Sequence, residues 1–229
     1  EFRKKGLVAA LLAATAFVAA CSPGYPRLLL WHKFARHDPA AEVAVSADPR
    51  CPKIGPQNLR EDEKAILLAA MAEVCAITLS DEFEREVRGR TWLATCLGAK
   101  GETISGDEVY RLFMGARPFS VRFRKPMNAE ATTEIANERM AIRRARLKAW
   151  RAGGAKRGAL INTLAHEMTH MVPATARPEI FRFQDSDHRK RKRPALELAS
   201  YGIGNLVEQL WLKRAGLPVP APRETVESC

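Results

Sequence analysis

Long hydrophobic runs are nearly absent from this chain of 229 residues, and neither glycine nor proline is enriched, at 14 residues each. With charged residues at 28%, this composition excludes a collagen, a long coiled coil and a mostly disordered chain. A single continuously apolar stretch also excludes a membrane protein with several spans. Acidic residues are fewer than basic ones, 26 against 37, and the formal net charge is +11. The hydrophobic share of 46% is enough for one compact domain or two small lobes around a cleft.

The one apolar stretch lies at the N-terminus, where residues 7–20 follow three basic residues and precede Cys21. These 14 residues are short for a spanning helix, which needs about 20, and fit a secretory signal. The Val-Ala-Ala-Cys sequence that ends at Cys21 is similar to a bacterial lipobox, in which cleavage precedes a lipidated cysteine. We therefore predict a signal peptide at 1–20 and a lipid-anchored protein of the bacterial cell envelope, on its periplasmic or extracellular face. Ordinary secretion and a retained short anchor are the alternatives.

Residues 21–60 are rich in proline and show little periodicity. We expect them to comprise the lipidated cysteine and a tether that lifts the folded domain off the membrane surface, with an inhibitory segment as the alternative. The folded domain is predicted at 61–217 and an irregular Pro-rich tail at 218–229.

Four cysteines remain after Cys21, an even number that suits disulfides in an oxidising compartment. Four cysteines allow three pairings. We favour Cys75 with Cys96 and Cys51 with Cys229, because the second bond would tie both ends of the chain to the body. Buried free thiols are the alternative.

The hydrophobic pattern predicts a mainly helical α+β fold with a small sheet. Apolar residues recur at helical spacing over 61–79, and Ser80 suits the start of a second helix through Val87. The region 90–114 is ambiguous because three glycines interrupt it. Alternation over 119–124 is typical of a half-buried edge strand.

Three further helices are expected towards the C-terminus. Helix-breaking residues, capping residues and apolar periodicity predict these helices at 129–150, at 158–172 before Pro173, and from Pro194 to about Ala215. We expect the sheet to pack on the second of these helices, because that helix carries an apolar stripe.

Residues 166–170 read His-Glu-Met-Thr-His and match the pattern H-E-x-x-H. Two histidines four residues apart project from one face of a helix and can bind a single ion. Glu167 points to the neighbouring edge of that face, where it can take a proton from a metal-activated water. The pattern therefore predicts Zn²⁺ held by His166 and His170, with Glu167 as the general base.

A catalytic zinc needs a third protein ligand and an open fourth position. The metzincin extension is absent, since Pro173 and Ala176 stand where its glycine and third histidine belong. The remaining candidates for the third ligand are Asp185, Asp187, His188 and Glu197. Glu197 is best supported by its surroundings, because on the last predicted helix it shares one face with a set of polar and small residues. These are Ser200, Tyr201, Gly204 and Glu208.

In this respect the chain resembles the gluzincin branch of the zinc metallopeptidases, especially the thermolysin-like group. That group has H-E-x-x-H on one helix and a second helix that reads approximately N-E-x-x-S-D-x-x-G-x-L-V-E. Residues 196–208 match this second helix at Glu197, Ser200, Gly204, Leu206, Val207 and Glu208. The resemblance covers about residues 158–212 and implies a zincin-like fold, hydrolysis of peptide bonds, and His166, His170 and Glu197 as the zinc ligands.

Two departures from the family pattern affect the groups around the metal. Leu196 stands where the family has an asparagine, and Tyr201 replaces an aspartate that orients a ligand histidine. Tyr201 could hold that histidine or stabilise an oxyanion. His188, which lies between the two metal helices, could stabilise the oxyanion instead. Asp187 or His188 could also replace Glu197 as the ligand, and His188 could close the site of a purely structural zinc.

Basic residues are concentrated on both sides of the motif. Residues 189–193 are all Lys or Arg, and seven more cations lie between 143 and 157. In an envelope protein these stretches could contact lipid headgroups, lipopolysaccharide or anionic wall polymers, or select acidic substrates, whereas a solvated surface is the plainest interpretation. No nucleic-acid partner is expected.

Taken together, these patterns predict an envelope-anchored zinc metallopeptidase that acts on a peptide or protein substrate. By analogy with zincins, the strand at 119–124 could pair with an extended peptide. The alternative is a non-catalytic lipoprotein that binds a protein or an anionic wall polymer on a degenerate zincin scaffold.

Overall fold

The computed structural model describes residues 43–46, 48–54, 59–94, 103–115, 120–124, 131–134, 139–172, 183, 185 and 197–220. All of these residues belong to one compact unit of the chain, Asp38–Cys229. The signal peptide, the lipidated Cys21 and the tail beyond residue 220 lie outside the described residues and stay predictions. Within the described part of the chain, no helix has the length and apolar character needed to cross a membrane.

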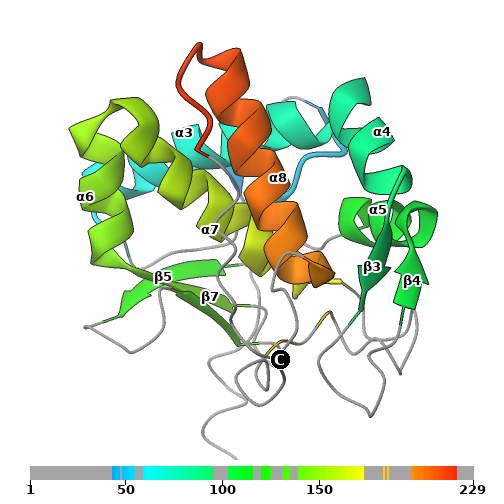
Figure 1. Cartoon of the computed structure of the whole chain (residues 1–229). Helices are drawn as coiled ribbons and strands as arrows, with labels where there is room; N and C mark the ends of the chain where they lie inside the picture. The colour runs from blue at the N-terminus through cyan, green and yellow to red at the C-terminus, as the bar shows by residue number, and fades with distance from the viewer. Residues whose placement is uncertain are drawn as a thin grey trace, which may run out of the picture. The chain divides into compact units, whose positions relative to one another are not determined.

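The described residues form a mixture of helices and small sheets, so the α+β prediction is confirmed at that level (Figure 1). The helices are α3 (Glu61–Thr78), α4 (Asp81–Arg88), α5 (Gly106–Met114), α6 (Arg144–Ala152), α7 (Gly158–Thr169) and α8 (Ala199–Arg214), with a 3-10 turn η4 (Gly154–Arg157) between α6 and α7. The strands are β1 (Val43–Ala44), β2 (Lys53–Ile54), β3 (Thr91–Leu93), β4 (Thr103–Ser105), β5 (Ser120–Arg124), β6 (Ala131–Glu134) and β7 (Arg139–Arg143).

Three small sheets are built from these strands. β1 pairs with β2 and β3 with β4, both antiparallel, while β7 lies between β5 and β6. β5 runs parallel to β7 and β6 runs antiparallel to it, with Thr133 opposite Met140. The predicted strand at 119–124 is therefore confirmed as an edge strand. The strand that contacts α7 is β6, at the other edge of this sheet.

The helix predicted at 129–150 is wrong, because this region forms β6, β7 and only then α6. Met140, Ala141 and Ile142 are all buried, as expected for a central strand covered on both faces. Such a strand is continuously apolar, and periodicity alone cannot distinguish it from a buried helix.

The other helices follow their sequence signals more closely. α3 and α4 match their predictions, and the Ser80 hydroxyl accepts a hydrogen bond from the Phe83 N–H at the start of α4. α8 begins at Ala199, later than expected, because Leu198 forms a parallel β-bridge with Leu93. Glu197 therefore precedes this helix and does not share its face. Gly216, with φ of 64°, follows the end of α8 as predicted.

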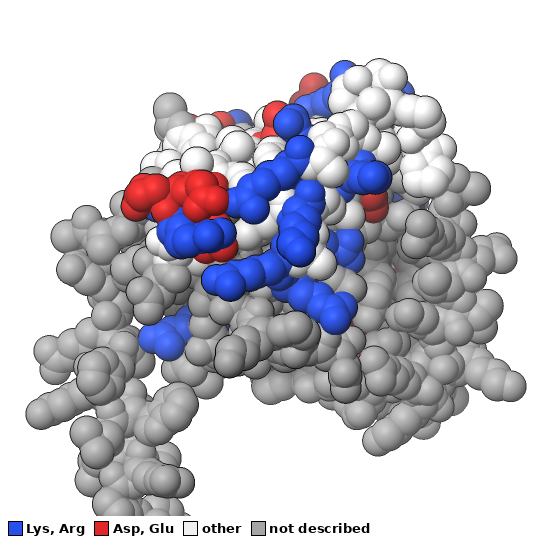
Figure 2. Space-filling model, turned by 90° about the vertical axis from the view of Figure 1, so that its left-hand side faces the viewer, with Lys and Arg blue, Asp and Glu red and all other residues white. Residues whose placement is uncertain are grey.

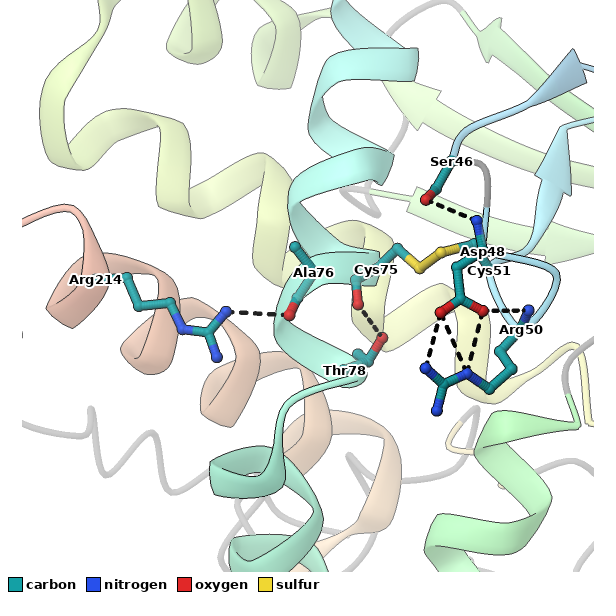
Figure 3. The surroundings of a disulfide bond; sticks show 8 residues. All are labelled: Ser46, Asp48, Arg50, Cys51, Cys75, Ala76, Thr78 and Arg214. Atoms are coloured by element: carbon teal, nitrogen blue, oxygen red, sulfur yellow. Dashed lines mark hydrogen bonds and ion pairs between the residues drawn. A yellow bond between two sulfur atoms is a disulfide. The ribbon is translucent and has the colours of Figure 1, made fainter.

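The disulfide joins Cys51 to Cys75, so the favoured pairings with Cys96 and Cys229 are wrong (Figure 3). The reason is the small hairpin of β1 and β2, which lays Cys51 against α3. Ile54 in this hairpin is fully buried in the core. The later part of the segment expected to be a tether thus belongs to the folded body.

α7 lies at the centre of the described fold and contacts α3, α6, α8 and β6. Its residues Leu160, Ile161, Leu164 and Ala165 are fully buried, so the stripe predicted to face the core does so. The apolar contacts fix the direction of α7 and thereby the direction of the side chains at its C-terminal end, where the motif lies.

Candidate metal centre

The two histidines of the motif lie on one face at the C-terminal end of α7. His166 is in the last turn of the helix and His170 is its C-cap. Their ring centroids are 5.2 Å apart, and the side chains are only 15% and 10% exposed. Two imidazoles are thus held close together in a largely desolvated place.

Asp185 brings a carboxylate to the same point from a distant segment of the chain. Its Oδ2 atom lies 3.1 Å from Nε2 of His166 and 3.7 Å from Nε2 of His170. The Ser200 hydroxyl, at the start of α8, donates a hydrogen bond of 3.1 Å to the same oxygen. One ligand atom from each of the three residues lies within 4.8 Å of the others.

The chemistry of this donor set fits a zinc ion, and its two N–O distances are close to those of a zinc site. Zinc in proteins takes imidazole nitrogens and carboxylate oxygens at about 2.0–2.2 Å in a tetrahedral arrangement. Two ligands of such an ion lie about 3.3 Å apart, a value that the two N–O distances above bracket. Three protein ligands leave the fourth position for water or substrate, as catalytic zinc sites require.

The electrostatics of the group follow from the same contacts. Burial opposes protonation of His166, but the hydrogen bond to Asp185 and the nearby charges of Glu167 and Asp185 outweigh it, and the pKa of His166 is raised. Burial likewise disfavours ionised Asp185, yet the bond to His166, the charge of His170 and the Ser200 hydroxyl hold its pKa well below the ordinary value. Asp185 is therefore a carboxylate, as a metal ligand must be.

Glu167 is buried beside these ligands and is fixed by the sheet. The residue is 4% exposed, and its Oε2 atom accepts a hydrogen bond of 2.5 Å from the hydroxyl of Thr133 on β6. The sheet edge therefore reaches the motif directly. Thr133 lies in the region 129–150, for which the sequence predicts a helix. Its contact with Glu167 spans 34 residues and leaves no local signal in the sequence.

α8 supports the histidines from the opposite side. The Tyr201 ring packs edge-on against His166, with ring centroids 4.6 Å apart. At Gly204 a Cβ atom would lie 3.0 Å from Cβ of His166, so only glycine lets the two helices approach this closely. Farther along, the Asn162 amide donates to Glu208 at 2.8 Å. Apart from Glu197, which precedes α8, the polar and small face predicted for this helix meets α7.

The sequence-predicted residues divide into three groups. His166, His170 and Glu167 are brought together with Asp185, one of the four residues considered for the third ligand. Glu197 is exposed and is not part of the group. Asp187 and His188 lie outside the described residues.

No known protein family, no curated protein and no solved structure matches this chain.

Proposed function

We propose that the chain is a zinc-dependent metallopeptidase in which His166, His170 and Asp185 hold the metal and Glu167 is the general base. The observation that carries this proposal is the convergence of three donor atoms within 4.8 Å beside a buried carboxylate. The ligand set differs from that of the gluzincins in its third member, which is Asp185 in place of Glu197. A zincin-like fold is part of the same proposal, since the motif helix packs between a sheet edge and a second helix.

The chain's own residues supply orientation and proton transfer. When bound, zinc would polarise a substrate carbonyl and increase the acidity of water. Glu167 accepts the proton of the attacking water and passes it to the leaving amine. Thr133 holds the Glu167 carboxylate in place, while Ser200 and Tyr201 hold Asp185 and His166. Oxyanion stabilisation by His188 remains part of the prediction.

The test is Glu167→Gln in the full chain, with labelled casein as the substrate and zinc measured in the same samples. Removal of a general base lowers turnover by about 10²–10⁴-fold. Zinc content should not change, because Glu167 is not one of the three donors. Glu197→Gln is the matched control, an exposed glutamate three residues before Ser200, and should keep both activity and zinc.

The proposal fails if the parent chain binds zinc without cleaving casein or unrelated peptides, since the ion would then be structural or part of a binding site. It fails equally if Glu167→Gln retains full turnover.

A further inference from the structure

A basic face lies on α6 and η4, and η4 adjoins the N-terminal end of α7, whereas the candidate metal centre lies at the C-terminal end. We define the basic face as Arg144, Lys148, Arg151, Lys156 and Arg157, which are all exposed on α6 and η4. From 139 to 166 the sequence has eight Lys or Arg residues and no Asp or Glu. Figure 2 shows Lys and Arg side chains gathered on the side of the molecule that α6 forms.

Among the described residues, acidic side chains compensate this face only at one border. Arg151 pairs with Asp62 at 2.5 Å and Arg144 lies 3.4 Å from Glu63, both at the start of α3. Lys148 and Lys156 have no acidic partner among the described residues. A positive charge therefore remains exposed along the middle of the face.

Arg157 adds to the basic face and has no acidic partner in the part of the chain that the structure describes. Its guanidinium stacks over the Trp150 ring, 5.1 Å from the centroid, and donates to the Trp150 carbonyl at 3.2 Å. These contacts hold the charge in place but do not neutralise it.

The arrangement of charges on α6 works against the helix. Arg144 and Lys148 are four residues apart, and Lys148 and Arg151 are three apart, so like charges are neighbours on one face. In α4 the same chain does the opposite, where Arg88 pairs with Glu84 four residues earlier. A face that only needed to be solvated could carry pairs of opposite charge, as α4 does, and these would not destabilise the helix.

The exposed residues between these cations are small, which indicates how the face makes contact. Ala145, Ala152, Gly154 and Ala155 are exposed, and Trp150 is buried beneath Arg157. The face therefore offers neither an apolar side chain to insert nor an aromatic platform for unpaired bases. Contact by charge alone suits a plane of phosphate headgroups, to which juxtamembrane Lys and Arg are attracted.

Binding at this face would leave the candidate metal centre accessible. Helix α7 has 12 residues and is about 18 Å long, with η4 at its N-terminal end and the metal-binding histidines at its C-terminal end. A bilayer that contacts η4 would therefore lie at the far end of α7 from the histidines.

We propose that the basic face docks the folded body on an anionic lipid bilayer. The proposal is independent of catalysis and of zinc. It also gives the predicted lipid anchor at Cys21 a second contact, because a lipid chain combined with a basic surface holds a protein to a membrane more firmly than either alone.

The test compares two double variants of the full chain that each lose two positive charges. Lys148→Gln with Lys156→Gln changes the basic face, and Arg85→Gln with Arg111→Gln changes exposed cations on α4 and α5. Binding is measured with vesicles containing 30% phosphatidylglycerol and with pure phosphatidylcholine vesicles at low salt. The pure vesicles report any binding through the apolar N-terminus.

Each cation near an anionic surface contributes about fivefold, so the basic-face variant should lose about 30-fold of its binding to the anionic vesicles. Its binding to the neutral vesicles should not change, and added salt should remove most of the difference. Unchanged zinc content and thermal midpoint check that the variant is folded.

Two results would overturn the proposal. The first is an equal loss in both double variants, which would show that net charge and not this face is responsible. The second is a parent chain that binds duplex DNA but shows no preference for the anionic vesicles.

Discussion

Thr133 links the sheet to the motif, because its hydroxyl donates a hydrogen bond to the Glu167 carboxylate. Thr133→Val removes this hydrogen bond and keeps the shape of the side chain, whereas Thr133→Ser keeps the hydroxyl. A hydrogen bond to a charged group contributes about 1.5–3 kcal/mol. We therefore expect kcat/KM to fall about 10- to 100-fold in the valine variant with zinc retained, and to recover in the serine variant. Equal activity of the two variants would contradict a positioning role.

The pairing of His166 with Asp185 predicts a pH dependence of the metal-free protein. The folded-state pKa of His166 is raised above 6.5, so its contribution is present below that pH and is lost as pH rises through the folded value. The pKa of Asp185 is lowered from 3.8, so its contribution is present above that pH and is lost on further acidification. The pair therefore stabilises the metal-free fold between about pH 4 and 6.5.

Zinc binds neutral imidazoles, so stabilisation by zinc increases as pH rises, whereas the stabilisation from protonated His166 decreases. The increase in urea midpoint on adding zinc should be larger at pH 8 than at pH 6. The variant His166→Gln should show a much smaller increase at either pH. A zinc-induced shift of equal size at both pH values in the parent would contradict proton competition at this pair.

At the scale of the elements, the close approach of α7 and α8 depends on Gly204. A Cβ atom there would lie 2.9 Å from the Asn162 carbonyl oxygen and 3.0 Å from Cβ of His166. Gly204→Ala should lower the free energy of unfolding by about 1–3 kcal/mol and weaken zinc binding, because the helices must separate. Gly115→Ala is the control, since its nearest contact, at 3.4 Å, is ordinary. Equal urea midpoints for both variants would argue against tight helix packing.

The elements were predictable where the chain gives a local signal. Ser80 and the periodicity of α3 are such signals, and Gly204 marks the face on which α8 meets α7. β6 and β7 were missed, since burial on both faces of β7 is a property of the assembled sheet. The sequence offers Asp185 as one of four candidate ligands but does not single it out, because residues 174–193 have no periodic pattern. The prediction of Glu197 as a ligand requires α8 to include residue 197, but α8 begins at Ala199.

At the scale of the whole molecule, the disulfide joins the hairpin of β1 and β2 to α3. Cys51 and Cys75 are separated by 24 residues, and a loop of this size predicts a stabilisation of about 3 kcal/mol. The double variant Cys51→Ala with Cys75→Ala should therefore unfold at lower urea, and reductant should shift the parent to about the same midpoint. Peptide mapping without reduction should find these two cysteines linked. A link from Cys75 to Cys96 would contradict this placement of the hairpin.

In the proposed metal centre Asp185 is the third ligand, and the zinc content of the full chain and two variants tests this role. We expect about one zinc per chain in the parent, much less in Asp185→Asn, and the parental amount in Glu197→Gln. Thermal midpoints of the metal-free proteins control for folding. Loss of zinc in Glu197→Gln but not in Asp185→Asn would restore the ligand set implied by the gluzincin resemblance. A parent that takes up no zinc would contradict the account as a whole.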